Sequence, residues 1–457
     1  MGEYKSMVEA PTGWLGSIPE HWECKKIGSL FSERKTKVSD ADYSPLSVTK
    51  LGIVPQLANA AKSDSGDNRK LVCSGDFVIN SRSDRKGSCG VSELDGSVSL
   101  INIVLTPRNS WDNKYVHYLM RSQPFSEEYY HYGRGIVADL WTTRYSEMKN
   151  ILLPVPPHDE QEQIVRFLDW KVSGINKLIN IKKKEIESLC ELRNSTIDRG
   201  ILHGFHHGDM KSSGIYWLGD IPSTWEVMPI KRVAKINASV ADIVKVLDDE
   251  ELLTFLPMEN VSERGEIDCS IKRPLKEIKS GYSSFAKGDV VVAKITPCFE
   301  NGKGACLDTL DTEIGFGTTE FINLRPGDEI LSRYLYMITM TQHFRKLGER
   351  VMTGSAGQKR ISANYIKNFT LGIPVIKEQE EILKKLDSTL SKIDELIEIK
   401  KSEISGLHEL KNRLISDVVT GNIDVRDIEI PEYEFTDESA DSDLGDVDFD
   451  VDEEQED

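Results

Sequence analysis

Asp159-Glu160-Gln161-Glu162-Gln163-Ile164 is repeated as Lys377-Glu378-Gln379-Glu380-Glu381-Ile382, 218 residues further along the chain. The same offset holds throughout residues 159–203 and 377–420, and the apolar residues of both copies step by three and four. This spacing predicts two amphipathic helices, each roughly 65 Å long. Each helix needs a partner to bury its apolar stripe, and the obvious partner is its own copy. The predicted seam consists of Ile164, Leu168, Ile175, Ile179, Ile186, Leu189, Ile382, Leu386, Ile393, Ile397, Ile404 and Leu407.

The repeat extends beyond the helices and thereby decides the domain organisation. Trp14-Leu15-Gly16-Ser17-Ile18-Pro19 is echoed by Trp217-Leu218-Gly219-Asp220-Ile221-Pro222, and Gly75-Asp76-Phe77-Val78-Ile79 is echoed by Gly288-Asp289-Val290-Val291-Val292. Between these anchors the two halves differ freely in sequence and length. The chain is therefore predicted to contain a globular domain, a long helix, a second globular domain, a second long helix and a tail.

The net charge of −18 is concentrated at the C-terminus. Residues 427–457 hold sixteen Asp or Glu and no Lys or Arg, which leaves 59 acidic residues (75 minus 16) against 57 basic ones. Segments this acidic and this poor in large apolar side chains are typically disordered, so we expect a disordered tail. Such a tail either solubilises the chain or mimics DNA in competing for a basic surface.

The sequence shows no sign of a membrane span, a disulfide framework or a metal site. No apolar run approaches the length of about 18 residues that a membrane helix needs. The seven cysteines form no CxxC pair, which suits a reducing cytoplasm. His203, His206 and His207 have no nearby cysteine, so a polar hinge is favoured over a metal site.

Each globular half has the pattern of mixed α and β structure. Apolar, β-rich runs predict strands at residues 77–80, 98–105, 290–295 and 321–324, and helical spacing predicts short helices at 115–121 and 332–344. The tryptophans of the repeated Trp-Leu-Gly motif are expected to be core or hinge anchors rather than a ligand site. Asp159 and Glu162 predict a capping box, and Gly204 and Gly421 predict C-terminal caps.

In the order and doubling of these motifs, residues 10–426 resemble the specificity subunits of type I restriction-modification systems. The resemblance rests on both Trp-Leu-Gly-x-Ile-Pro entries, on both Glu-Gln-Glu triplets with the prolines Pro156 and Pro374 before them, and on residues 354–361 and 420–426. It implies an α+β fold in which two target-recognition domains are separated by two long helices, packed as an antiparallel coiled coil with a pseudo-two-fold repeat. The implied boundaries are 1–157 and 205–374 for the domains, 158–204 and 375–421 for the spacer helices, and 422–457 for the tail.

The resemblance also implies a function in which this chain is not the enzyme. Each domain would read one half of a bipartite, asymmetric double-stranded DNA target. The helices would set the spacing and bind two methyltransferase subunits that methylate adenine N6, and restriction subunits would act as translocases. S-adenosylmethionine, ATP and Mg would belong to these partners, in a cytoplasmic complex that defends against phage.

The absence of catalytic motifs in the sequence agrees with that division of labour. No Gly-x-x-x-x-Gly-Lys-Ser/Thr phosphate loop is present, and no Asn/Asp-Pro-Pro-aromatic stretch that an amino-methyltransferase would use on a flipped base. Glu277-Ile278-Lys279 matches only a fragment of a nuclease motif, and such triplets are common by chance. Catalysis is therefore expected in other subunits.

Candidate DNA contacts are basic, amide and hydroxyl side chains in loops, because Arg and Lys read guanine, Asn and Gln read adenine, and hydroxyls contact phosphates. The loops that follow the strands predicted at 77–80 and 290–295 are favoured. The candidates are Ser81, Arg82, Arg85, Lys86, Arg134, Lys294, Thr296, Asn301, Lys303, Thr318, Thr319, Gln358, Lys359 and Arg360.

Two other functions fit the same sequence. A stand-alone DNA-binding regulator would need no methyltransferase partner, and a coiled-coil protein scaffold would show no salt-dependent, sequence-selective DNA binding. Lys182 and Lys400 fall on the seam, either as polar residues that fix the helix register or as contacts to a methyltransferase.

Overall fold

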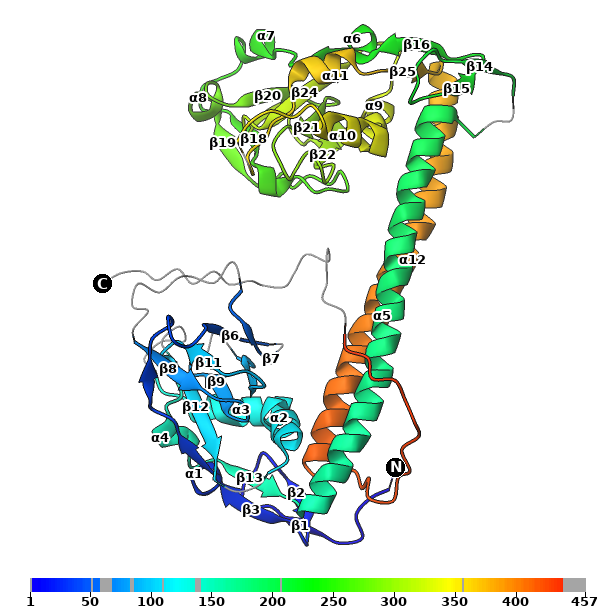
Figure 1. The fold of residues 1–457 in the computed structure, drawn as a ribbon. Coiled ribbons are helices and arrows are strands. Elements are labelled where there is room, and N and C mark those ends of the chain that lie inside the picture. The colour runs from blue at the N-terminus through cyan, green and yellow to red at the C-terminus, as the bar shows by residue number, and fades with distance from the viewer. Residues whose placement is uncertain are drawn as a thin grey trace. The chain divides into compact units, whose positions relative to one another are not determined.

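The computed structural model (Figure 1) describes residues 2–50, 52–57, 68–82, 86–108, 111–135, 141–205, 208–355 and 357–438. The chain divides into two compact units. Unit 1 consists of residues 1–183 and 401–457, and unit 2 consists of residues 184–400. Each unit contains one globular part and one half of each of two long helices, α5 (His158–His203) and α12 (Ile376–Val419).

The globular part of unit 1 combines short strands with short helices. Its strands are β1 (Met7–Glu9), β2 (Ser17–Pro19), β3 (Glu23–Lys26), β4 (Phe31–Glu33), β5 (Lys37–Val38), β6 (Leu46–Thr49), β7 (Gly52–Pro55), β8 (Arg69–Val72), β9 (Phe77–Asn80), β10 (Cys89–Val91), β11 (Gly96–Val98), β12 (Asn102–Pro107) and β13 (Leu152–Val155). Its helices are α1 (Ile27–Leu30), α2 (Asn113–Arg121), α3 (Gln123–His131) and α4 (Tyr145–Met148).

The globular part of unit 2 is built in the same way. Its strands are β14 (Met210–Ser212), β15 (Asp220–Pro222), β16 (Glu226–Pro229), β17 (Ala234–Ile236), β18 (Leu252–Leu256), β19 (Lys272–Pro274), β20 (Ser283–Ala286), β21 (Val290–Ala293), β22 (Gly304–Cys306), β23 (Ile314–Gly317), β24 (Phe321–Pro326) and β25 (Thr370–Ile373). Its helices are α6 (Ile230–Val233), α7 (Ala241–Val244), α8 (Leu275–Ile278), α9 (Ser332–Met340), α10 (Gln342–Glu349) and α11 (Ala363–Asn368), with 3-10 turns η3 (Met258–Asn260) and η4 (Leu307–Thr309).

The central sheets of the two units have the same strand order. Unit 1 has β10-β9-β12-β4 and unit 2 has β22-β21-β24-β17, with antiparallel pairing throughout. The register is shared as well, because Leu105 pairs with Phe77 in unit 1 and Leu324 pairs with Val290 in unit 2. Helix α2 packs on β10, and α9 packs on β21 and β22. The repeat seen in the sequence is therefore a structural duplication.

Two of the predicted elements are each divided into two observed ones. The strand predicted at 98–105 is divided between β11 and β12, and the helix predicted at 332–344 is divided between α9 and α10. The second break occurs at Thr341, whose backbone is extended and whose hydroxyl accepts a hydrogen bond from the N–H of Phe344. An N-cap of this kind starts a new helix and ends the previous one.

The long helices pack against each other, which confirms the predicted mixed helix-and-sheet fold with paired long helices. In unit 1 the first half of α5 lies against the second half of α12, and in unit 2 the second half of α5 lies against the first half of α12, so the pair is antiparallel. Most of the predicted seam is buried, for example Ile164, Leu168, Ile382 and Leu386. Leu189, Ile404 and Leu407 are only partly buried.

Two reciprocal ion pairs join the helices at their polar seam positions. Lys182 Nζ lies 3.0 Å from a Glu403 carboxylate oxygen in unit 1, and Lys400 Nζ lies 3.0 Å from Glu185 in unit 2. Lys400 and Glu403 are the repeat equivalents of Lys182 and Glu185. These lysines therefore act between the helices, which agrees with a role in fixing the register.

The C-terminal ends of both long helices agree with the sequence, but α5 starts before the predicted cap residue Asp159. Gly204 and Gly421 have φ angles of 70° and 82°, and both pack against a tryptophan, Trp225 and Trp22 respectively. Trp22 and Trp225 are buried in the core. Trp14 and Trp217, the tryptophans of the Trp-Leu-Gly motif itself, are only partly buried and pack against the two main hydrophobic clusters. The predicted capping role of Asp159 is wrong, because the helix starts at His158 and Asp159 lies within its first turn.

The expectation of a disordered tail is wrong for residues 422–438. This segment forms hydrogen bonds to α5, for example from Asn180 Nδ2 to the carbonyl of Asp437 at 2.8 Å. Side-chain amides of α5 bind the backbone of this C-terminal segment, so the segment is held on the helix despite its acidic composition. Residues 439–457 lie outside the described residues.

Neither a membrane helix nor a metal cluster occurs in the part of the chain that the structure describes. No described helix is long and apolar enough to cross a membrane. No group of three or more His, Cys, Asp or Glu side chains there could hold a metal ion. In the predicted histidine hinge, His203 Nδ1 lies 3.1 Å from the carbonyl of Asp220, and His206 and His207 lie outside the described residues.

Candidate nucleic-acid interface

The glutamines of the repeated Glu-Gln-Glu motif join each globular part to its long helix. In unit 1, Gln161 donates to the carbonyl of Pro156 at 2.9 Å and accepts from the N–H of Asp112, the N-cap of α2, at 3.2 Å. In unit 2, Gln379 donates to the carbonyl of Pro374 at 2.8 Å and accepts from the N–H of Leu331, the N-cap of α9, at 2.9 Å. The motif thus builds the same junction twice.

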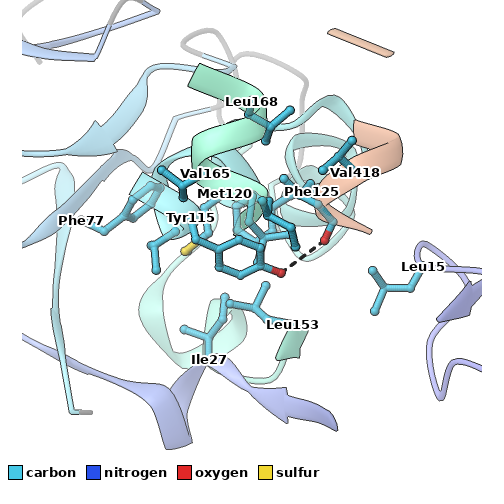
Figure 2. Packing of buried hydrophobic residues seen from close by; sticks show 14 of the residues in the cluster. Leu15, Ile27, Phe77, Tyr115, Met120, Phe125, Leu153, Val165, Leu168 and Val418 are labelled. Atoms are coloured by element: carbon cyan, nitrogen blue, oxygen red, sulfur yellow. Dashed lines mark hydrogen bonds between the residues drawn. The ribbon is translucent and has the colours of Figure 1, made fainter. Parts of the chain in front are cut away.

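A buried tyrosine adds a second junction in each unit. The Tyr115 hydroxyl lies 3.3 Å from the carbonyl of Val419 at the end of α12, and the Tyr334 hydroxyl lies 3.0 Å from the carbonyl of Ile201 near the end of α5. Figure 2 shows Tyr115 packed among Leu153, Leu168 and Val418. Each globular part is therefore tied to the start of one long helix and to the end of the other.

The candidate loops of unit 1 are brought together by one short segment. Thr142 forms isolated antiparallel bridges with both Arg82 and Arg134, and the N–H of Thr143 donates to the carbonyl of Ser81 at 2.9 Å. The loop after β9 and the loop after α3 thus lie side by side. The side chains of Arg82 and Arg134 are exposed there.

An aromatic stack borders this cluster. The rings of Tyr130 and Trp141 stack with centroids 5.8 Å apart, and the indole N–H of Trp141 donates to the Tyr130 carbonyl at 2.9 Å. Lys86 Nζ lies 5.4 Å from the Tyr130 ring centroid, within the range of a cation–π contact. Lys86 is therefore part of the same surface, whereas Arg85 lies outside the described residues.

Unit 2 repeats this arrangement with different side chains. Arg360 forms isolated antiparallel bridges with both Ile295 and Thr353, as Thr142 does with Arg82 and Arg134. The Thr296 hydroxyl accepts from the N–H of Lys359 at 3.0 Å, which holds the loop after β21 against residues 357–360. The two post-strand loops that the sequence favoured are thus equivalent in structure.

Arg360 is paired with an acid on its own surface. Its guanidinium donates to Glu320 at 3.0 Å from both Nε and Nη2, and 44% of its side chain is exposed. The hydrogen bonds from Arg360 lower the pKa of Glu320 from its ordinary value. The carboxylate therefore offsets the charge of Arg360 at neutral pH.

The remaining candidates occupy neighbouring loops of unit 2. The Thr318 hydroxyl accepts from the N–H of Glu320 at 3.2 Å, and Gln358 is exposed beside Lys359. Asn301 donates to Glu263 at 2.7 Å, and the N–H of Lys303 donates to the Cys298 carbonyl at 2.8 Å. Asn301 and Lys303 do not line the cleft described next.

A polar cleft of about 520 Å³ in unit 2 gathers three of the candidates, Lys294, Thr319 and Arg360. It is also lined by amide and hydroxyl side chains that the sequence reasoning missed. These are Asn237, Ser239, Ser283, Ser284 and Asn323. Such groups donate and accept hydrogen bonds of the kind that base edges offer.

Asn323 marks a difference between the two units. It pairs with Val291 in the sheet, at the place where Val104 pairs with Val78 in unit 1. Val104 lies in an apolar cluster, whereas Asn323 is only 2% exposed and its Oδ1 has no hydrogen-bond partner among the described residues. An asparagine inside the apolar run Phe-Ile-Asn-Leu was the signal that could have revealed this cleft.

Comparisons with known proteins agree on one family. Residues 222–406 match the family model described as the type I restriction modification DNA specificity domain. The EcoAI specificity subunit of Escherichia coli, a type I restriction enzyme subunit, is 37% identical over 199 residues, which cover 43% of this chain and 33% of that protein. The chain spans about a third of the length of this relative, and of the similar EcoEI subunit.

Two more distant similarities cover most of the chain. A putative type I restriction enzyme specificity subunit, MjaX of Methanocaldococcus jannaschii, is 22% identical over 458 residues, which cover 90% of this chain and 96% of that protein. A chain from a solved structure on the assembly and conformational transition of a type I restriction-modification system has a TM-score of 0.61 at 14% identity, over 89% of this chain and 99% of that one. The latter shows a shared fold. The resemblance inferred from the repeated motifs is confirmed.

Proposed function

We propose that the chain is the non-catalytic, sequence-recognising subunit of a type I restriction-modification system, on the premise that residues 222–406 match the DNA specificity domain model of that family. Each globular part would read one half of a bipartite DNA target. The two parts share a frame and differ in their loops, so the two half-sites would differ in sequence. We assign residues 1–157 and 205–374 to the two target-recognition domains.

The observation that carries this proposal is the repeated loop cluster. Arg82, Thr142 and Arg134 in unit 1 occupy the bridged positions of Ile295, Arg360 and Thr353 in unit 2. In both units the cluster follows a central strand and presents exposed arginine. Arginine in such loops either forms bidentate bonds to guanine or neutralises phosphate. Two equivalent basic surfaces are what a reader of two half-sites needs.

The long helices would set the spacing between the half-sites. Residues 158–204 and 375–421 are assigned to this spacer, whose register is fixed by the seam and by the reciprocal ion pairs. Half-sites read on one face of DNA lie about one turn apart, roughly 34 Å. The target would therefore contain a non-specific stretch between two specific ones.

Catalysis would be supplied by partner subunits. Two methyltransferase subunits would bind the spacer and methylate adenine N6 with S-adenosylmethionine, and restriction subunits would use ATP and Mg to translocate DNA. The assembled complex would act in the cytoplasm against phage DNA. This chain would determine the DNA sequence at which those subunits act.

Exchange of one globular part tests the proposal. Residues 10–150 are replaced by the corresponding part of another specificity subunit, in cells that supply the methyltransferase, and methylated adenines are mapped across the genome. We expect a split motif in which one half changes and the other half stays. A motif that changes in both halves, or the absence of any motif that depends on this chain, would contradict the proposal.

A further inference from the structure

One face of α5 in unit 1 carries polar side chains that bind the chain's own C-terminal segment. Ser173, Asn176, Asn180 and Lys183 are spaced by three and four residues, which places them on one side of the helix. We call these four residues the polar face. The segment that lies on it, residues 425–438, is called the strap.

The polar face binds the strap through main-chain atoms. Ser173 Oγ donates to the Glu434 carbonyl at 3.2 Å and accepts from the N–H of Thr436 at 2.8 Å. Asn176 donates to the Thr436 carbonyl at 3.2 Å, and Asn180 donates to the Asp437 carbonyl at 2.8 Å. Because backbone groups are recognised, these contacts select an extended segment rather than particular side chains.

Glu438 of the strap is recognised by charge. The Glu438 carboxylate lies 2.6 Å from Lys411 Nζ, 3.3 Å from Lys183 Nζ and 3.3 Å from His408 Nε2. Burial favours the neutral carboxyl, but the hydrogen bond and charge of Lys411, together with His408 and Lys183, lower the pKa of Glu438. The carboxylate thus stays ionised among basic side chains of both long helices.

The second copy of this face in unit 2 has different chemistry. Ser391, Asp394, Glu398 and Lys401 stand at the repeat positions of the polar face. Asp394 pairs with Arg193 at 3.0 Å, whereas its equivalent Asn176 is neutral and accepts from Lys411, the equivalent of Arg193, at 3.2 Å. Because Asn176 is neutral, the charge of Lys411 is balanced by Glu438 instead. In the second copy Asp394 already offsets the charge of Arg193, and the carboxylate of Glu398 cannot donate the hydrogen bond that Asn180 donates to the strap.

We propose that the polar face of α5 is a binding site for one extended peptide segment that carries a carboxylate next to its main-chain contacts, occupied in cis by the strap. The charge of Glu438 holds the strap on the polar face, and release of the strap exposes Lys183, His408 and Lys411. The site exists in the first copy of the repeat and distinguishes it from the second. Binding of the strap to the polar face does not depend on the proposed DNA recognition, and neither experiment that tests it contains DNA.

Amide hydrogen exchange of Thr436 in the full chain reports whether the strap is closed, since that N–H donates to Ser173. We expect Glu438→Gln to raise its exchange rate on the order of tenfold. Glu432→Gln removes the same charge from an exposed strap residue and should leave the rate unchanged. Equal rates in the two variants, or an unprotected Thr436 N–H in the unmodified chain, would overturn the proposal.

A peptide of residues 425–438 tests the site in trans. Labelled peptide is added to the full chain carrying Glu438→Gln, whose own strap competes less, and fluorescence anisotropy is followed. Binding should weaken at least tenfold with a peptide carrying Glu438→Gln, and should persist with one carrying Glu432→Gln. It should also weaken when the half-buried Asn180 of the full chain is changed to Glu, as in the second copy. Absence of binding, or indifference to all three changes, would refute the site.

Discussion

Tyr115 and Val419 are 304 positions apart, yet the tyrosine hydroxyl lies 3.3 Å from the valine carbonyl at the end of α12. Tyr334 makes the equivalent bond to Ile201 near the end of α5, at 3.0 Å. Both tyrosines are fully buried. Each globular part is thereby tied to the helix that belongs to the other copy of the repeat, so neither half of the sequence completes its own unit.

We predict that Tyr115→Phe and Tyr334→Phe each lower the free energy of unfolding by about 0.5–1.5 kcal/mol, the usual net value of one buried hydrogen bond. The ring packing is kept, so the change removes only the hydrogen bonding of the hydroxyl, which for Tyr115 also includes a longer contact to the Pro154 carbonyl at 3.4 Å. Urea denaturation of the full chain measures the change. Tyr216→Phe is the matched control, because Tyr216 is fully exposed and should not respond. A result equal to this control would mean that the bonds do not join the helix ends.

The junction glutamines should be more sensitive than the tyrosines. Gln379 is fully buried and joins the carbonyls of Glu329 and Pro374 to the N–H of Leu331. Gln379→Ala leaves these groups unpaired, and we expect a loss of about 1–3 kcal/mol in urea denaturation. Glu380→Ala, one position on and exposed, should change stability by less than about 0.5 kcal/mol. Equal effects would refute the junction.

Arg82→Ala and Arg360→Ala should each affect one half-site. We expect a loss in affinity for the specific target on the order of ten- to a hundred-fold if the arginine contacts a base. Genome-wide adenine methylation should relax in a different half of the motif for each variant. Lys5→Ala and Lys211→Ala, exposed basic residues outside both clusters, are the controls. Relaxation of the same half by both arginine variants would contradict separate reading.

Removal of Glu320 should strengthen DNA binding. Glu320→Gln leaves Arg360 without its paired acid, so non-specific affinity should rise and the salt dependence of binding should steepen by roughly one charge. Fluorescence anisotropy at several salt concentrations measures both. Weaker binding would instead indicate that Glu320 positions Arg360 for its contact.

The same pair gives a pH dependence. The folded pKa of Glu320 is lowered, so the stabilising pair is complete above the ordinary value of 4.5 and is lost as pH falls through the lower folded value. Non-specific DNA affinity of the unmodified chain should therefore approach that of the Glu320→Gln variant in this acid range. If the unmodified chain and the Glu320→Gln variant differed in DNA affinity as much in the acid range as at neutral pH, the result would be inconsistent with this titration.

The sequence predicted the parts of the fold that depend on periodicity. Apolar steps of three and four identify α5 and α12, and the constant offset identifies the duplication before any contact is known. The strap was missed because its carbonyls, not its side chains, are bound by Asn176 and Asn180. Amino-acid composition reflects only the acidic residues of the strap and therefore predicts disorder.

The candidate interface could be predicted only in outline. The loops after β9 and β21 stand out because they carry polar residues after buried strands. That Thr142 and Arg360 would each join two such loops depends on tertiary bridges between segments distant in sequence. Asn237 and Ser284 meet Asn323 in the cleft only after three separate strands assemble. No local sequence pattern predicts that these three residues lie together.

The reciprocal pairing of Lys182 with Glu403, and of Lys400 with Glu185, bears on how such a chain can evolve. Each lysine meets a glutamate encoded by the other copy of the same segment. Recombination that replaces one half by a related half would restore both partners without a compensating mutation. New globular parts can therefore be inherited on an old frame while the helices keep their register.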